Sequence, residues 1–151
     1  MSDPNVDVLN DVTKTLIDSQ KGYQMVFDLA DESHLLREKF RSLAAERLEL
    51  ISAFQTRVAE YGGDPVTSGG TGGSLHRAWA DFTSLFQSDE KTALEAVDDG
   101  EDYLAERIGH ALDHKELDVS TIELLERARA SARYGERFAD ALGVLSDLAR
   151  R

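Results

Sequence analysis

The chain has 151 residues, of which 17 are Lys or Arg, 29 are Asp or Glu and none is Cys. The formal charge of −12 argues against nucleic acid or an anionic membrane surface as the main partner, because phosphate groups would be repelled. The lack of cysteine excludes disulfides, thiolate metal sites and a cysteine nucleophile. Because the sequence also has no long apolar run and no signal peptide, we expect a cytoplasmic protein.

Apolar residues recur every three or four positions in several segments, a spacing typical of amphipathic helices. We expect four long helices and one short helix, over residues 5–31, 32–61, 74–87 (the short one), 89–114 and 119–149. Residues 62–73 hold six of the eleven glycines and are expected to form a flexible linker. This linker is not a phosphate-binding loop, because no Gly-Lys-Ser/Thr follows it.

The lengths of the connections predict how the helices are joined within one domain over residues 1–151. Short loops join the first long helix to the second and the third to the fourth. The long connection between the second and third helices allows these two to run parallel. This is the connectivity of a ferritin-like four-helix bundle, here with a long crossover that carries the short extra helix. The predicted fold class is therefore all-α.

Polar residues interrupt the apolar seams near the middle of the helices. Glu101 stands where Leu or Val is expected, and Arg47 lies in the seam of the second helix beside Glu46. A buried carboxylate needs a partner, because its desolvation costs several kcal/mol. We therefore expect a structural polar layer of Tyr23, Glu46, Arg47 and Glu101, with a tyrosine hydroxyl taking part as buried tyrosines commonly do.

A carboxylate-only metal site is the alternative interpretation of the same seams. Its ligands would be Asp18, Glu46, Glu49, Glu101 and Glu136. Carboxylate oxygens favour hard ions, so the metal would be iron or manganese and the protein an oxidoreductase or iron-handling protein. The strict di-iron pattern needs Glu-x-x-His on two helices, whereas the second helix offers Glu46-x-x-Glu49 and the fourth has no histidine.

A second arrangement of metal-binding residue types lies on the third long helix. Glu106, His110 and His114 share one stripe of this helix and could hold a divalent metal. Histidines near a helix C-terminus also interact favourably with the helix dipole, which explains them without a metal. No Ser/His/Asp set has a supporting context, so the sequence gives no catalytic residue. It also identifies no cofactor-binding residue.

Apolar residues outside the seams suggest a protein partner, such as a second copy of the chain. The candidates for this surface are Leu35, Phe86, Leu148 and the short helix that contains Trp79.

Five short motifs, taken in order, resemble one known family: Lys21-Gly22-Tyr23, Ala45-Glu46-Arg47, Tyr61-Gly62-Gly63-Asp64-Pro65, Ser74-Leu75-His76-Arg77-Ala78-Trp79 and Gly100-Glu101-Asp102. Over roughly Val6 to Ala149 the chain resembles the bacterial ferritin-like four-helix-bundle proteins grouped as domain of unknown function 2383. The resemblance implies an up-down-down-up bundle and a stress-associated soluble protein, and it supplies no activity. Arg47 departs from true ferritins, because a guanidinium inside the layer would oppose a metal ion.

Overall fold

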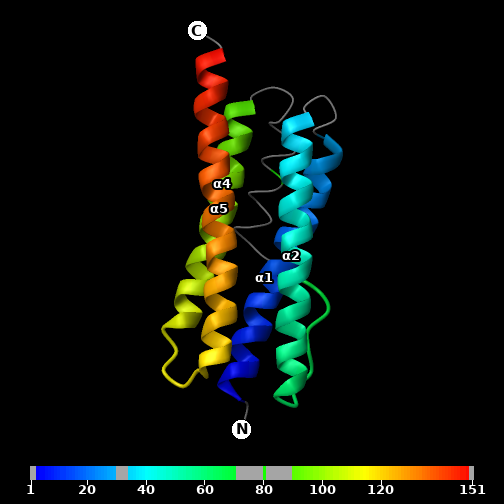
Figure 1. The fold of residues 1–151 in the computed structure, drawn as a ribbon, viewed down its shortest axis with the longest axis vertical. Helices are drawn as coiled ribbons and strands as arrows, with labels where there is room; N and C mark the ends of the chain where they lie inside the picture. The colour runs from blue at the N-terminus through cyan, green and yellow to red at the C-terminus, as the bar shows by residue number, and fades with distance from the viewer. Residues whose placement is uncertain (1–2, 30–33, 71–79, 81–89, 150–151) are drawn as a thin grey trace.

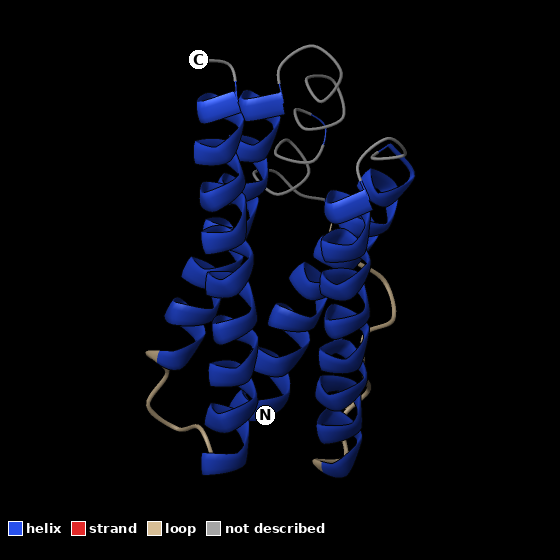
Figure 2. Cartoon of the chain, turned by 45° about the horizontal axis from the view of Figure 1, so that its top comes forward, coloured by secondary structure: helices blue, strands red, loops and turns tan. Residues whose placement is uncertain are grey.

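The computed structural model describes residues 3–29, 34–70, 80 and 90–149. Within them lie four long helices and no strand, so the chain is all-α (Figure 2). The helices are α1 (Pro4–Leu29), α2 (His34–Glu60), α4 (Glu90–Leu112) and α5 (Val119–Ala149). Their ends differ from those expected by no more than two residues. The expected short helix over residues 74–87 lies, apart from residue 80, outside the described residues.

The four helices form two antiparallel hairpins that pack into a bundle. α1 pairs with α2 and α4 pairs with α5, and these two pairings make the most extensive interfaces in the described chain. The colour gradient in Figure 1 shows that α2 and α4 both run toward the end of the bundle where α1 begins. The polar layer expected at mid-helix would therefore lie where all four helices pass each other.

The end of α2 is set by two glycines. The Gly62 N–H donates to the carbonyl of Ala59, and the Gly63 N–H donates to the carbonyl of Val58. This pair of bonds is the Schellman arrangement, which requires a left-handed residue after the helix. Gly62 has a φ of 81°, which glycine adopts without a steric penalty. The helix therefore stops here and the chain turns back along the bundle.

The first part of the glycine-rich linker is held against α1 and α2, although the sequence predicts that it is flexible. The Asn10 side chain donates to the carbonyl of Asp64 at 3.0 Å and accepts from the Val66 N–H at 3.1 Å. The Gln55 side-chain amide donates to the carbonyl of Val66 at 2.9 Å. Two helix side chains thus provide the hydrogen bonds that the linker backbone cannot make with itself.

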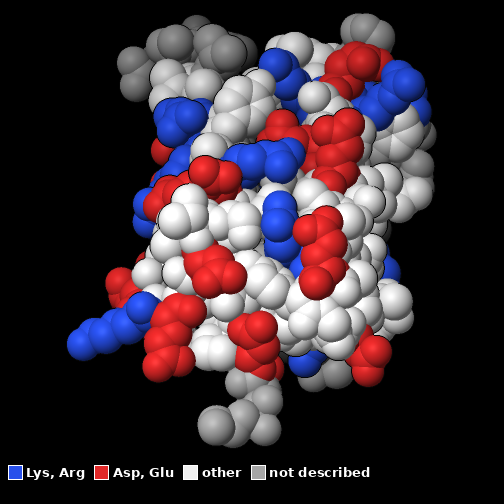
Figure 3. All heavy atoms as spheres, turned by 60° about the horizontal axis from the view of Figure 1, so that its bottom comes forward, with Lys and Arg blue, Asp and Glu red and all other residues white. Residues whose placement is uncertain are grey.

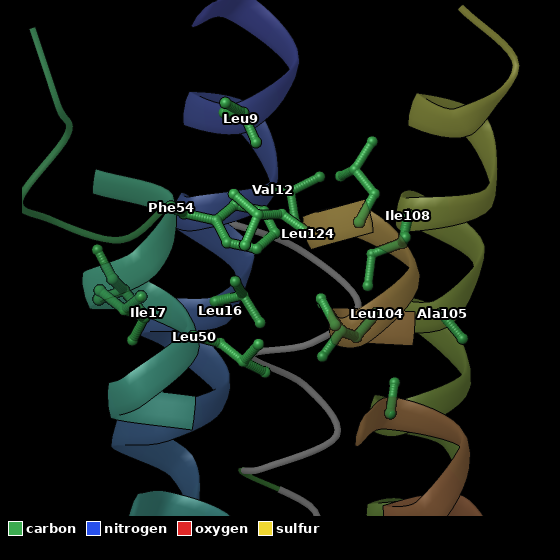
Figure 4. Close-up of a cluster of buried hydrophobic side chains, with 14 of the residues drawn as sticks. Leu9, Val12, Leu16, Ile17, Leu50, Phe54, Leu104, Ala105, Ile108 and Leu124 are labelled. Atoms are coloured by element: carbon green, nitrogen blue, oxygen red, sulfur yellow. The ribbon is translucent and has the colours of Figure 1, made fainter. Parts of the chain in front are cut away.

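Buried apolar side chains form two clusters along the bundle. The first fills the end near the start of α1, and Figure 4 shows its side chains pointing into the space between the helices, among them Leu9, Leu16, Leu50, Phe54, Leu104 and Ile108. The second fills the opposite end with Tyr23, Leu36, Phe40, Leu43, Leu94, Ala96, Val97 and Ala139. Burial of these residues is the main force that holds the helices together.

The surface carries scattered charges and a few large apolar side chains. Figure 3 shows acidic and basic side chains interspersed over one face. The exposed large apolar residues are Leu35, Leu48, Val119, Ile122, Tyr134 and Val144. Phe86 and Trp79, expected to contribute to a partner surface, lie outside the described residues, as does the side chain of Leu148. No described helix has the length and apolar character needed to span a membrane.

Candidate functional site

Each of the four helices places one polar side chain at the same level of the bundle. Ser19 of α1, Arg47 of α2 and Glu101 of α4 have no exposed surface, and Ser131 of α5 is 5% exposed. Along α1, α2 and α4, these residues fall between the members of the two apolar clusters. The core is therefore divided by a polar layer that touches every described long helix. From here on, the name polar layer refers to Ser19, Arg47, Glu101 and Ser131 and no longer to the set expected from the sequence.

Every N–H of the Arg47 guanidinium has an acceptor. Nη1 donates to Glu101 Oε1 at 2.9 Å, and Nη2 donates to Glu101 Oε2, which makes a two-pronged ion pair. Nη1 also donates to Ser19 Oγ. Nε donates to Ser131 Oγ at 3.0 Å, and Nη2 also donates to the carbonyl of Ser131 at 3.2 Å. A guanidinium has five N–H groups, so its hydrogen-bonding capacity is used completely.

The charges of the buried pair stabilise each other. Burial alone would lower the pKa of the Arg47 guanidinium, but the adjacent Glu101 carboxylate more than offsets this and raises the pKa above its usual range. The mutual attraction of the pair and its hydrogen bonds replace the hydration that burial removes. Arg47 thus stays protonated at any physiological pH and acts as a fixed cation in the core.

Tyr23 joins the polar layer to the second apolar cluster. Arg47 Cζ lies 5.5 Å from the centroid of the Tyr23 ring, and that ring lies 5.8 Å from the ring of Phe40. Burial raises the pKa of the Tyr23 hydroxyl well above 10.0, and the negative charge of Glu101 raises it further. The phenol therefore remains neutral, and its ring covers the guanidinium on the side of the second cluster.

A glycine gives the Glu101 carboxylate its space on the α5 side. A Cβ atom at Gly135 would lie 2.0 Å from Glu101 Oε2, far closer than two atoms can pack. Gly135 has a negative φ like its helical neighbours, so it serves for close approach and not for an unusual backbone conformation. Residue 135 is therefore as much a part of the site as the two charged residues.

The structure brings together Tyr23, Arg47 and Glu101 but places Glu46 elsewhere. Glu46 was expected in the buried layer, yet its side chain is exposed. Consecutive residues on a helix point about 100° apart, so Arg47 in the interior leaves Glu46 at the surface. Its charge still raises the pKa of Arg47 through space.

The sequence pattern did not assign Ser19, Ser131 or Gly135 to the site. The signal that was available is the run of small residues in the α5 seam, where Ala128, Ala132 and Gly135 follow one face. Small residues in a helical seam indicate that something bulky crosses from a neighbouring helix. Here the bulky group is the ion pair formed by Arg47 and Glu101.

The five carboxylates considered as metal ligands are not gathered around one point. Asp18 Oδ2 accepts the Gly70 N–H at 3.1 Å, so this side chain holds the linker. Glu136 Oε2 accepts a hydrogen bond from Arg133 Nη1 at 2.8 Å. Glu101 is bound by Arg47, while Glu46 and Glu49 are exposed. The donor set does not fit a dinuclear centre, since a guanidinium lies where the cation would be needed.

The expected stripe of Glu106, His110 and His114 is also divided, because α4 ends at Leu112 and His114 lies beyond it. His110 and His114 line a groove of about 270 Å³ between α1 and α4, together with Asp11 and Arg107, whereas Glu106 does not line it. In residues 3–29, 34–70, 80 and 90–149, no three His, Asp or Glu side chains are arranged to hold a metal ion. The positive charge of Arg107 beside the two histidines would further oppose a cation.

A larger groove lies directly outside the polar layer. It has a volume of about 570 Å³ and is lined by Ser42, Glu46, Glu49, Leu50, Arg127, Ala130, Ser131 and Tyr134. All of these residues belong to α2 and α5. Ser131 belongs both to this groove and to the hydrogen bonds of Arg47, so the groove lining contacts the buried pair directly.

Comparison with known protein families identifies a match over most of the chain. The family model described as Domain of unknown function (DUF2383) matches residues 5–114, which include α1, α2 and α4 with Tyr23, Arg47 and Glu101. Neither the curated proteins nor the solved structures gave a significant match.

Proposed function

The chain belongs to the family described as Domain of unknown function (DUF2383), and from its site we propose that it acts by binding a ligand and not by metal chemistry. One observation carries this proposal: the Arg47 guanidinium fills the middle of the bundle and uses Glu101 as its counter-ion. The polar layer then serves to fix the helices relative to each other, because its hydrogen bonds can all form in only one alignment of the helices.

The groove between α2 and α5 supports the binding half of the proposal. Its volume falls in the range of small-molecule sites, and its lining combines the apolar residues Leu50 and Ala130 with hydroxyl and charged groups. The groove meets the polar layer at Ser131, which belongs to both. A rigid contact of this kind suits a binding site, because a preorganised site loses less entropy when its ligand binds.

Three finer expectations also enter the proposal: the first rests on the lengths of the connections, the second on the family resemblance and the third on the sequence composition. They are a ferritin-like crossover, a bacterial stress-associated role and a place in the cytoplasm. The parallel run of α2 and α4 is compatible with such a crossover (Figure 1). In this proposal the ferritin-like connectivity is kept, while the metal centre is replaced by an ion pair.

Metal loading tests the part of the proposal that excludes metal chemistry. The full chain is incubated anaerobically with Fe(II) or Mn(II), unbound metal is removed by gel filtration, and metal content is measured by elemental analysis. We expect fewer than about 0.1 ions per chain, because the carboxylates are separated and one is neutralised by Arg47. About two ions per chain, lost in Glu46→Ala and in Glu101→Ala, would overturn the proposal in favour of a dinuclear centre.

A further inference from the structure

The groove between α2 and α5 is lined by three charged side chains, two acidic and one basic. α2 and α5 lie toward the front of Figure 1. All the residues that line the groove belong to these two helices. Glu46 and Glu49 line its α2 wall, and Arg127 lines its α5 wall. None of the three makes an ion pair or hydrogen bond with another residue of the described ranges. By contrast, Arg129 of α5 is paired with Glu126, and Arg57 of α2 is paired with Glu60.

The two glutamates are placed to act on one ligand. They are three positions apart on α2, so both side chains project from the same face of the helix. Like charges at this spacing repel each other and are destabilising when no cation lies between them. The overall charge of −12 adds to the attraction for a positively charged ligand. A cationic group bound between Glu46 and Glu49 would relieve this repulsion.

The other lining residues restrict what else the ligand carries. Leu50 and Ala130 offer an apolar surface for methylene groups. Tyr134 also lines the groove, and its hydroxyl accepts a hydrogen bond from the Lys39 ammonium at 3.0 Å. Arg127 is a single positive group that suits a carboxylate. The groove therefore complements a short aliphatic molecule with two cationic groups and one carboxylate.

We infer that the α2/α5 groove binds a free basic amino acid of the arginine or lysine class. The side-chain cation and the α-ammonium group pair with Glu46 and Glu49, and the α-carboxylate pairs with Arg127. This inference rests on the proposed binding function and names its ligand class. The metal analysis and the ligand titration are independent measurements, so failure of one does not decide the other.

Titration of the full chain with L-arginine at constant ionic strength tests the inference. Binding is followed by amide chemical shifts, up to about 20 mM ligand because partly exposed ion pairs contribute little each. We expect shifts centred on residues 42–50 and 127–134. Citrulline, which lacks the side-chain charge, should bind at least about tenfold more weakly, and agmatine, which lacks the carboxylate, several-fold more weakly.

Variants separate specific binding from general attraction to an acidic protein. The pair Glu46→Gln with Glu49→Gln should lower the affinity for arginine at least about tenfold, whereas Glu106→Gln, on the exposed side of α4, should leave it unchanged. Ala130→Leu keeps every charge but fills the groove, so it should also abolish binding. Arg127→Gln should remove the preference for arginine over agmatine, because that preference comes from the carboxylate.

Three outcomes would overturn the inference. The first is no localised shift at the highest concentration. The second is equal weakening by Glu106→Gln and by the Glu46/Glu49 pair, which would indicate unspecific attraction. The third is equal binding of N-acetylarginine amide, which has only the side-chain charge. That result would identify the ligand as a basic side chain of a partner protein.

Discussion

Gly135 of α5 lies against Glu101 of α4 so closely that any side chain at position 135 would overlap with the carboxylate. A Cβ there would be 2.0 Å from Oε2 and 2.8 Å from the carboxyl carbon. The carboxylate cannot move away easily, because Arg47 holds both of its oxygens. The packing of α5 on α4 therefore depends on a residue without a side chain at this position.

Gly135→Ala should lower the free energy of unfolding, although alanine is the better helix former. The added methyl group must displace either α5 or the carboxylate, and overpacking of this kind costs about 1–3 kcal/mol. Urea denaturation followed by circular dichroism measures the change. Gly143→Ala is the matched control, since nothing lies within 4 Å of a Cβ at Gly143 and it is also in α5.

The control should change stability in the opposite direction. Alanine in an open helical position stabilises by up to about 1 kcal/mol relative to glycine. A stabilising effect of the same size for Gly135→Ala would contradict the close contact between α5 and Glu101.

Arg47→Met should be among the most damaging substitutions in the chain. It leaves the buried Glu101 carboxylate without its counter-ion, which costs about 3–5 kcal/mol. The double variant Arg47→Met with Glu101→Leu removes both charges at similar volume, and we expect it to regain most of that loss. Urea denaturation of the two single variants and the double variant gives the coupling energy.

Arg57→Met is the control for these single and double variants. Arg57 forms an ion pair with Glu60 on the surface of α2, so its replacement should change stability by less than about 1 kcal/mol. Additive effects of Arg47→Met and Glu101→Leu would show that the two residues do not act as a pair.

Much of the fold was accessible from the sequence because burial imposes a periodicity that can be read directly. Four long helices appear where the apolar spacing predicts them. Arg47 and Glu101 were also accessible, since a charged residue in an apolar seam is costly unless it has a partner. Their adjacency in space follows from both residues lying near the middle of their helices.

The rest depends on how neighbouring helices are rotated about their axes. Serine fits a helix surface and a helix interface equally well, so the pattern did not reveal that Ser131 binds Arg47. Asp18 binds the backbone of Gly70, a contact between residues far apart in sequence that periodicity does not contain. Likewise, Glu46 and Glu49 form part of a groove only because α5 provides the opposite wall.

Stability should fall with rising pH because of one pair of carboxyl groups. Asp98 of α4 shares a side-chain hydrogen bond with Asp140 of α5, which requires a proton between them. Burial, this hydrogen bond and the charges of Asp140, Glu136 and Asp99 raise the pKa of Asp98 from 3.8 to about 7. Between pH 3.8 and about 7, the folded state therefore holds a proton that the unfolded chain has already released.

Because the pKa of Asp98 is raised in the folded state, its proton stabilises the fold at low pH. The contribution is fully present below about pH 3.8 and is lost as the pH rises through about 7. Asp98→Asn mimics the protonated form, so it should be more stable than the wild type at pH 8 and equal to it near pH 4. The gain should be about 1 kcal/mol, because Asp98 is partly exposed and solvent weakens the effect. Thermal melts across this range measure it.

Glu95→Gln, one turn earlier on α4 and exposed, serves as the control and should not alter the pH dependence. A wild-type curve that stays flat between pH 4 and pH 8, or a shift of equal size in Glu95→Gln, would contradict the role of Asp98.

Asn10→Ala should release the linker and leave the bundle largely intact. The substitution removes the bonds to the carbonyl of Asp64 and the N–H of Val66. Hydrogen exchange at the Val66 amide should then accelerate by at least about tenfold, because its acceptor is lost. The melting temperature should fall only slightly, since Asn10 is outside both apolar clusters. Gln24→Ala, which removes a side chain that accepts a hydrogen bond from Gln20 on the same helix, should leave exchange at Val66 unchanged. Unaltered exchange in Asn10→Ala would mean that Gln55 and the neighbouring linker contacts hold the segment without Asn10.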